Sequence, residues 1–272
     1  MTTDTVFEIR TFGQEEAPAM TAISADVGWN QPEAEIREII ARSGKYLFGA
    51  FCGGKLVGTA AAYPYPDGKF AYVNEVIVSS ALRKRGAATQ LLKKLLPLAL
   101  ADYPVLRLCA TALGRPIYEK FGFKPFATVR IGKFSGGEAD AAGITPLVGS
   151  DLAEAAELDA ANFGAHRPEV LKKLLERAPD AAWKLVRGGK MAGFIVRGSI
   201  NWVPQCRDAE AFTALLAYAN AQVPGVPALI REEHERYLPG AFDEHFKLTL
   251  MQYGDAFPPP PAAFCGFLPD IG

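Results

Sequence analysis

The pattern of apolar and polar positions in the first half of the chain predicts an α/β domain. Short apolar or β-branched runs, bounded by turn residues, alternate with longer segments whose apolar residues recur at helical spacing. We expect strands at 7–11, 46–51, 55–63, 71–78, 105–110 and 126–134. We expect helices at 15–27, 33–43, 86–102 and around Tyr118, with the helix at 86–102 kinked or shortened by Pro97.

The second half of the chain repeats the same order of elements. It predicts strands near 144–147, 182–187, 191–197, 200–203 and 227–231, and helices at 151–162, 168–178 and 208–222. Residues 135–143 read SGGEADAAG, a composition typical of a linker. The sequence therefore predicts two tandem α/β (α+β) domains, 1–134 and 144–272, joined by a linker at 135–143.

Composition and charge narrow the classes of function. Of the 272 residues, 49% are hydrophobic and 22% charged, and the net charge of −1 argues against a nucleic-acid partner. The four cysteines are scattered without a Cys-x-x-Cys pair, so neither a metal site nor a disulfide framework is expected. The polar N-terminus lacks the apolar core of a signal peptide, and no membrane-spanning run occurs. We expect a cytoplasmic protein without a membrane partner.

Residues 76–89 carry the most specific chemical signal in the chain. The β-branched run Val76-Ile77-Val78 is followed by a basic turn, by Gly86 and two alanines, and then by a leucine-rich helical segment. Such a turn presents free backbone N–H groups at the positive end of a helix, where they bind anions. The small side chains let a phosphate approach the main chain, which predicts a cradle for a diphosphate. The alternative is a basic, solvated helix start.

Two common phosphate motifs are absent from this segment. A Walker loop requires Gly-x-x-x-x-Gly-Lys-Ser/Thr, and a dinucleotide fingerprint requires Gly-x-Gly-x-x-Gly, whereas Gly86 stands alone. The segment Arg83-x-x-Gly86-x-Ala88 instead resembles the coenzyme A pyrophosphate loop of the GNAT superfamily of N-acetyltransferases. Downstream, residues 112–123 (ALGRPIYEKFGF) resemble the closing motif of that superfamily, a short helix with a tyrosine followed by Phe-Gly-Phe.

The whole chain resembles a GNAT subgroup with two tandem domains, of which the C-terminal one is degenerate. The strings that carry this resemblance are Gly28-Trp29-Asn30-Gln31, the run from 110 to 118, and Asn162-Phe163-Gly164-Ala165 with Arg167. The second half has no glycine loop before its helix at 208, and Asp208 at that helix start repels a phosphate. We therefore expect two GNAT-like domains, with a cofactor site in the first.

The resemblance implies acetyl-CoA as the acetyl donor. In the superfamily, the strand before the loop splays from its neighbour, and its main chain binds the pantetheine arm while the loop amides bind the pyrophosphate. The cofactor-binding residues implied here are Val76, Ile77, Val78, Arg83, Lys84, Arg85, Gly86, Ala87, Ala88, Thr89, Thr111 and Tyr118.

Acetyl transfer to an amine needs an acid for the departing thiolate and a base for the ammonium proton. Tyr118 matches the superfamily tyrosine and is the candidate acid, the alternative being a packing role. Glu75 is the carboxylate on the central strand and the candidate base. Strand alternation puts Tyr72, Asn74, Val76 and Val78 on one face and Val73, Glu75 and Ile77 on the other. A bulge could turn Glu75 toward the Tyr72 face; without one, the base is water-mediated or comes from another segment.

The acceptor pocket is expected to involve the first two helices, and the sequence leaves open whether the C-terminal domain contributes to it. Its candidate residues are Trp29, Asn30, Tyr72 and Asn74, although Trp29 could equally fill the core. We predict an acetyl-CoA-dependent N-acetyltransferase acting on a primary amine of a small molecule or peptide. The alternatives are a non-catalytic CoA-binding regulatory protein and an acyltransferase for a longer acyl-CoA. Whether the chain forms a homodimer is open.

Overall fold

The computed structural model describes residues 6–137, 140–198, 201–255 and 264–265. The chain forms two compact units. The first comprises Met1–Cys109, Ile117–Lys124 and Gln252–Asp255, and the second comprises Ala110–Pro116, Pro125–Met251 and Ala256–Gly272. Each unit combines strands of a mixed, mostly antiparallel sheet with flanking helices, which confirms the predicted fold class.

The first unit contains a sheet with the strand order β1-β2-β3-β4-β5. Its strands are β1 (Glu8–Arg10), β2 (Leu47–Cys52), β3 (Lys55–Tyr65), β4 (Phe70–Val78) and β5 (Val105–Ala110). Its helices are α1 (Ala17–Asp26), α2 (Glu33–Ser43), α3 (Ala87–Asp102) and α4 (Arg115–Lys120), with short 3-10 turns η1 (Gln14–Glu16), η2 (Gly44–Tyr46) and η3 (Ser80–Leu82). All of these strands and α-helices lie close to their predicted positions.

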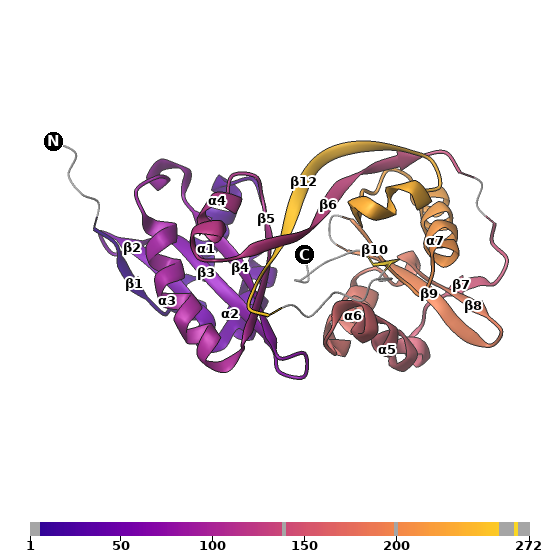
Figure 1. Ribbon diagram of the computed structural model, residues 1–272, viewed down its shortest axis with the longest axis horizontal. Helices are drawn as coiled ribbons and strands as arrows, with labels where there is room; N and C mark the ends of the chain where they lie inside the picture. The colour runs from indigo at the N-terminus through magenta and orange to yellow at the C-terminus, as the bar shows by residue number, and fades with distance from the viewer. Residues whose placement is uncertain (1–5, 138–139, 199–200, 256–263, 266–272) are drawn as a thin grey trace. The chain divides into compact units, whose positions relative to one another are not determined.

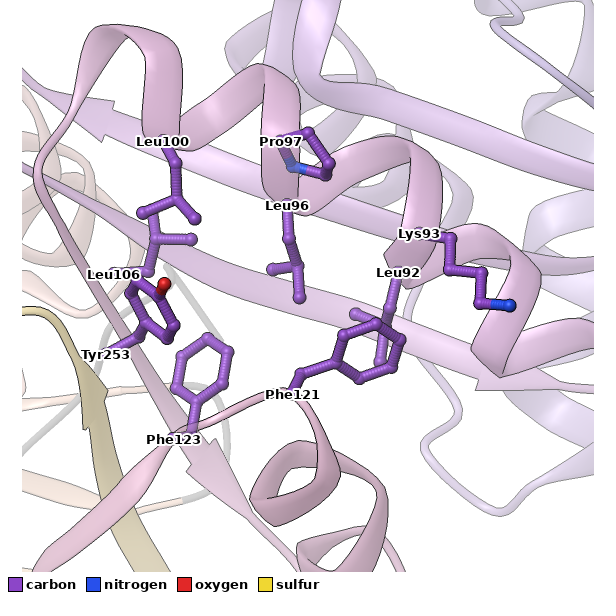
Figure 2. A pocket seen from close by; sticks show the side chains of 9 residues that line it. All are labelled: Leu92, Lys93, Leu96, Pro97, Leu100, Leu106, Phe121, Phe123 and Tyr253. Carbon is purple, nitrogen blue, oxygen red and sulfur yellow. The ribbon is translucent and has the colours of Figure 1, made fainter.

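Helices cover both faces of this sheet. The guanidinium of Arg42, on α2, lies 4.3 Å from the ring centroid of Tyr63 on β3, so α2 covers the face that carries Tyr63. The helix α3 lies across the strands in Figure 1 and covers the opposite face, where Leu106 of β5 lines the same cavity as Leu96 and Leu100 of α3 (Figure 2). The sheet is therefore buried on both sides, which explains its nearly continuous apolar strands.

Proline 97 does not end α3. The helix continues through Pro97 to Asp102, so the expectation of an early end is wrong. The apolar residues around it explain why the helix persists: Leu92, Leu96 and Leu100 pack toward Phe121 and Phe123 around a cavity of about 260 Å³ (Figure 2). Packing of this apolar face offsets the helical hydrogen bond that proline cannot make.

The second unit repeats the succession of elements of the first. Its strands are β6 (Lys124–Ser135), β7 (Ile144–Pro146), β8 (Ala182–Arg187), β9 (Lys190–Arg197), β10 (Trp202–Cys206), β11 (Ala228–Arg231), β12 (Ala241–Tyr253) and β13 (Phe264–Cys265). Its helices are α5 (Leu152–Phe163), α6 (Pro168–Arg177) and α7 (Ala209–Gln222), with the 3-10 turns η4 (Gly149–Asp151), η5 (Pro179–Ala181) and η6 (Glu232–Tyr237). The strand order is β12-β6-β11-β10-β9-β8-β7, and β13 pairs with β10.

The division into units differs from the expected boundary at residues 135–143. The strand β6, expected to close the first domain, groups from Pro125 onward with the second unit and pairs with β11. Conversely, Gln252 and Tyr253 at the end of β12 belong to the first unit. There Tyr253 lies 5.8 Å from Phe123, and Gln252 accepts a hydrogen bond from Arg107. Each unit is therefore completed by residues from the other half of the sequence.

Candidate functional site

The strands β4 and β5 pair along only part of their length. Their parallel ladder joins Phe70, Ala71 and Tyr72 to residues 105–107, whereas β4 continues to Val78 and β5 to Ala110. On its other side β4 stays paired with β3 as far as Val78. Beyond Tyr72 the β5 side of β4 thus opens, which is the splayed geometry that the sequence resemblance implies.

A β-bulge interrupts β4 at Glu75. The register runs from Ala61 opposite Asn74 to Thr59 opposite Ile77, so Ala60 faces two residues, Glu75 and Val76. The φ angle of Glu75 is +50°, in the left-handed region. Non-glycine residues adopt this region at a cost of about 1–3 kcal/mol and concentrate at functional sites.

The bulge corrects the expected alternation along β4. Thr59 and Ala61 share a face of β3, so their partners Ile77 and Asn74 also share a face, although three positions separate them. Val78 pairs with Gly58 and lies on the opposite face. The expectation that Asn74 and Val78 share a face, with Ile77 opposite, is therefore wrong, because the extra residue reverses the alternation.

The bulge also determines the face of the sheet to which the side chain of Glu75 points. The residue is 1% exposed, and its Oε1 accepts a hydrogen bond from Nε2 of Gln31 at 3.2 Å. Gln31 lies between α1 and α2, so Glu75 points to the sheet face that these helices cover, the face of Tyr72 and Asn74. The main-chain carbonyl of Glu75 accepts a hydrogen bond from the hydroxyl of Thr59 at 2.8 Å, which anchors the bulge.

The basic turn leads into α3 through two left-handed residues. Lys84 has a φ of +61° and Gly86 a φ of +89°, and Gly86 is the N-cap residue of α3. The first helical hydrogen bond runs from the amide of Gln90 to the carbonyl of Gly86 at 3.0 Å. The amides of residues 87–89 therefore precede the first helical donor, as expected for a helix N-terminus that binds an anion.

Gly86 leaves the approach to these amides open. A methyl group built at this position would meet one neighbour within 4 Å, the side-chain nitrogen of Gln90 at 3.9 Å. The basic side chains of Arg83, Lys84 and Arg85 are exposed around it. These residues fit a diphosphate, because the amides at the start of α3 are uncovered, Gly86 has no side chain, and the surrounding side chains are positively charged.

Asp26, at the end of α1, fixes the start of this loop. Its two carboxylate oxygens accept hydrogen bonds from the amide of Ser80 at 2.6 Å and from the hydroxyl of Ser80 at 2.9 Å. These bonds from the amide and the hydroxyl of Ser80 lower the pKa of Asp26 below its usual range. The guanidinium of Arg83 then donates from Nε to the carbonyl of Val78 at 3.3 Å, so the loop is tied both to α1 and to the end of β4.

Tyr118 is on α4 and 8% exposed. Burial raises the pKa of its phenol above the usual value, and the neighbouring Cys109 adds to the shift. Cys109 follows the last β5 residue that pairs with β4, so Tyr118 lies beside the part of β5 that has left its neighbour. The ring packs edge-on against Phe123 at 6.0 Å, so the residue packs and also carries a proton at neutral pH.

The remaining predicted residues differ in their surroundings. Trp29 is 47% exposed, so the proposal that it fills the core is wrong. Asn30 is exposed, with a φ of +53° and its amide donating to Gly28. Tyr72 is buried, whereas Asn74 is half-buried and its two amide atoms make no hydrogen bond within the part of the chain that the structure describes.

Thr111 falls in the second unit, whereas the other predicted site residues fall in the first. Its hydroxyl accepts a hydrogen bond from the amide of Gly114 at 3.1 Å, and its carbonyl accepts one from Arg115 at 2.9 Å. The sequence interpretation also missed three residues that hold the site together: Ser24, Gln31 and Thr59. For Gln31 the signal was its place directly after Trp29 and Asn30, which had been assigned to the acceptor pocket.

Within the described ranges, no three His, Cys, Asp or Glu side chains are arranged to hold a metal ion. Among the helices of those ranges, none is long and apolar enough to cross a membrane.

Comparisons with known proteins find similarity to N-acetyltransferases. Residues 13–123 match the acetyltransferase (GNAT) family. An uncharacterized N-acetyltransferase of Bacillus subtilis (strain 168), YitH, is 21% identical over 197 residues, which are 70% of this chain and 68% of the relative.

Solved structures share the fold. An acetyltransferase candidate from Pyrococcus horikoshii superposes with a TM-score of 0.80 at 19% identity, over 100% of this chain and 98% of its own. A GCN5-related N-acetyltransferase from Anabaena variabilis has a TM-score of 0.63 at 15% identity, over 91% of this chain and 72% of its own. At these identities the likeness concerns the fold alone.

Proposed function

We propose that the chain transfers an acetyl group from acetyl-CoA directly to a primary amine of a small molecule or peptide, because residues 13–123 match the acetyltransferase (GNAT) family and the Bacillus subtilis relative is named an N-acetyltransferase. One observation carries this proposal: β4 opens from β5 beyond Tyr72 and leads into the bare amides at the start of α3. An open strand edge continuous with an anion site suits an extended amide-bearing arm that ends in a diphosphate.

The main chain of Val76, Ile77 and Val78 would hold the pantetheine arm of acetyl-CoA. Strand edges bind extended ligands by the same backbone hydrogen bonds that join strands. The amides from Arg85 to Thr89 and the basic side chains of Arg83 and Lys84 would hold the diphosphate. These contacts place the thioester beside the acceptor amine, and such positioning alone lowers the barrier to acyl transfer.

Tyr118 is the proposed general acid. A tyrosine phenol is protonated at neutral pH, and burial raises the pKa of this one further, so it has a proton to give to the departing thiolate. Its position beside Cys109, where β5 has separated from β4, supports this role.

Glu75 is the proposed general base. The bulge directs its carboxylate toward the face of Tyr72 and Asn74, where the acceptor pocket is proposed. Because Glu75 is 1% exposed, we propose that it receives the amine proton through one water molecule, an accepted geometry for a general base. Trp29 and Asn30, both exposed, would form the outer wall of this pocket.

The second unit is proposed to be a degenerate copy without a cofactor site. The helix α7 is capped by Asp208, whose carboxylate accepts a hydrogen bond from the amide of Ala211 at 2.8 Å and so already occupies the helix N-terminus. The strands β10 and β11 pair at Trp202 and Ala228, and β13 pairs with β10 at residues 205 and 206. A carboxylate and a strand of the same chain thus take the positions that correspond to the cradle and the open edge of the first unit.

The cradle is tested by the variant Gly86→Glu. A glutamate at a φ of +89° fills the approach to the amides and repels a diphosphate, so titration calorimetry should show no acetyl-CoA binding. The matched control is Gly54→Glu: Gly54 has a φ of +75° and open surroundings in the β2–β3 turn, so this variant adds the same charge and similar backbone strain elsewhere. Unchanged affinity in a folded Gly86→Glu protein would refute the proposed cradle.

The reaction is tested by thiol release from acetyl-CoA with a panel of primary amines. Turnover with acetyl-CoA supports the proposal. A preference for donors with long acyl groups would instead indicate that the enzyme uses a longer acyl-CoA. Saturable binding of coenzyme A without turnover on any amine would contradict acetyl transfer.

A further inference from the structure

Gln31 bridges the two elements that form the proposed acceptor pocket. It lies between α1 and α2 and is half-buried. Its side-chain oxygen accepts a hydrogen bond from the hydroxyl of Ser24 at 2.8 Å, and its side-chain nitrogen donates to Glu75 at 3.2 Å. A single amide thus connects the buried Ser24 of α1 to the bulge of β4.

Ser24 fixes which end of the amide faces Glu75. The main-chain amide of Gln31 donates to the hydroxyl of Ser24 at 3.2 Å, so the hydroxyl oxygen is an acceptor in that bond. Its one hydrogen is then given to the side-chain oxygen of Gln31. In this arrangement the amide nitrogen is the end that faces the carboxylate, whereas a flipped amide would place its oxygen against the carboxylate oxygen and lose the bond to Glu75.

This orientation acts on the charge of Glu75. A donor directed at a carboxylate stabilises the ionised form over the protonated form, which counteracts the effect of burial. The hydroxyl of Thr59 holds the main chain of Glu75 at the same time, so backbone and carboxylate are fixed from two sides. An ionised carboxylate with a fixed rotamer is what a general base near neutral pH requires.

We infer that Gln31 is a positioning residue that, locked by Ser24, keeps the carboxylate of Glu75 ionised and directed toward the acceptor. The catalytic role of this contact rests on the proposed function, whereas the contact between Gln31 and Glu75 can be measured without turnover. The inference adds Gln31 to the proposed functional residues, which otherwise lie in the basic loop, in β4 and at Tyr118.

The test is a titration of the Glu75 carboxyl group by carbon-13 NMR, with the signal assigned by its loss in Glu75→Gln. In Gln31→Leu the midpoint of the Glu75 titration should rise by about one pH unit or more, because a hydrogen bond to a charged group is lost. Gln31→Glu keeps the side-chain length and should raise it further, because a second carboxylate faces the first. Gln14→Leu is the matched control, since Gln14 also donates from its side-chain nitrogen, to the carbonyl of Arg37 at 2.9 Å.

Kinetics provide the second readout. In Gln31→Leu the acidic limb of kcat/KM should move to higher pH by the same amount, with unchanged acetyl-CoA affinity. In Glu75→Gln the acidic limb that belongs to Glu75 should be absent, and adding Gln31→Leu to that background should lower kcat/KM no further, because the two residues act as one unit. An unchanged Glu75 midpoint in folded Gln31→Leu and Gln31→Glu would overturn the inference. A shifted midpoint in a protein without any transferase activity would support the contact while refuting the proposed function.

Discussion

Asp26 and Ser80, 54 positions apart in the sequence, form a two-point contact: one carboxylate accepts hydrogen bonds from both the amide and the hydroxyl of one serine. The contact joins the end of α1 to the turn that precedes the basic loop. The helix that borders the proposed acceptor pocket is therefore connected directly to the loop proposed to hold the diphosphate.

Replacing Asp26 by alanine should weaken acetyl-CoA binding severalfold while leaving the fold intact. The loop start loses its anchor on α1, so the amides of the cradle are less well ordered before binding. Calorimetric titration measures the affinity, and circular dichroism checks the fold. Glu33→Ala, which removes a surface carboxylate paired with Arg37, is the control and should bind normally.

The contact between Asp26 and Ser80 also predicts how the stability of the protein changes with pH. Because the pKa of Asp26 is lowered in the folded protein, the contribution of this contact is present above the unfolded pKa near 3.8 and is lost as the pH falls through the folded value. Acid unfolding of Asp26→Ala should therefore depend less on pH below about 4 than that of the unaltered protein. An identical pH dependence would show that the contact does not hold the loop.

Replacing Tyr118 by phenylalanine should lower kcat by about 10²- to 10⁴-fold, the usual contribution of a general acid. The ring can still pack against Phe123, so stability and acetyl-CoA affinity should change little. Tyr103→Phe removes a hydroxyl elsewhere in the first unit, from a ring that packs on Tyr46, and is the matched control. Equal activity of the two variants would leave Tyr118 with a packing role alone.

The bulge at position 75 predicts that asparagine there gives a more stable protein than valine, the reverse of the order in a regular strand. In a regular strand valine is favoured over asparagine. At a φ of +50°, however, a β-branched residue is strained whereas asparagine is tolerated. Glu75→Val should therefore be less stable than Glu75→Asn by about 1–2 kcal/mol in urea unfolding. The usual order, with valine more stable, would contradict the bulge.

Tyr253 should matter for the stability of the first unit although it lies near the end of the described chain. Its ring packs on Phe123 and covers Gly122, where a methyl group would come within 3.1 Å of it. Tyr253→Ala should lower the unfolding free energy by about 1–3 kcal/mol, measured by thermal unfolding. Tyr237→Ala, in the second unit, is the comparison, and only Tyr253→Ala should also weaken acetyl-CoA binding by disturbing the unit that carries the cradle.

Local patterns were sufficient to predict most of the fold. Apolar runs and helical spacing located the elements from β1 to β11 because each buries a recognisable stripe or face. The strand β12 was missed, since charged residues such as Asp243, Glu244 and Lys247 interrupt its alternation and few of its side chains are buried. The exchange of strand ends between the units was also missed, because no local pattern specifies which neighbour a strand finds.

The geometry of the basic loop was predictable from the local sequence. Gly86 and the basic turn mark the N-terminus of α3 without knowledge of the fold, whereas the anion site itself stays a prediction. The direction of Glu75 was not predictable, because the bulge arises from the pairing of β4 with Thr59 and Ala60 of β3 and leaves no signature in β4 itself. The contact of Glu75 with Gln31 spans 44 positions and depends on that pairing.

The assignment of Gln252–Asp255 to the first unit affects how the protein is made. A ribosome synthesises the first 124 residues early, yet the residues that complete their fold emerge after nearly all of the second unit. Until Tyr253 has been made, the ring of Phe123 lacks the partner that lies 5.8 Å away in the folded protein. Neither half of the sequence on its own contains all the residues of its unit.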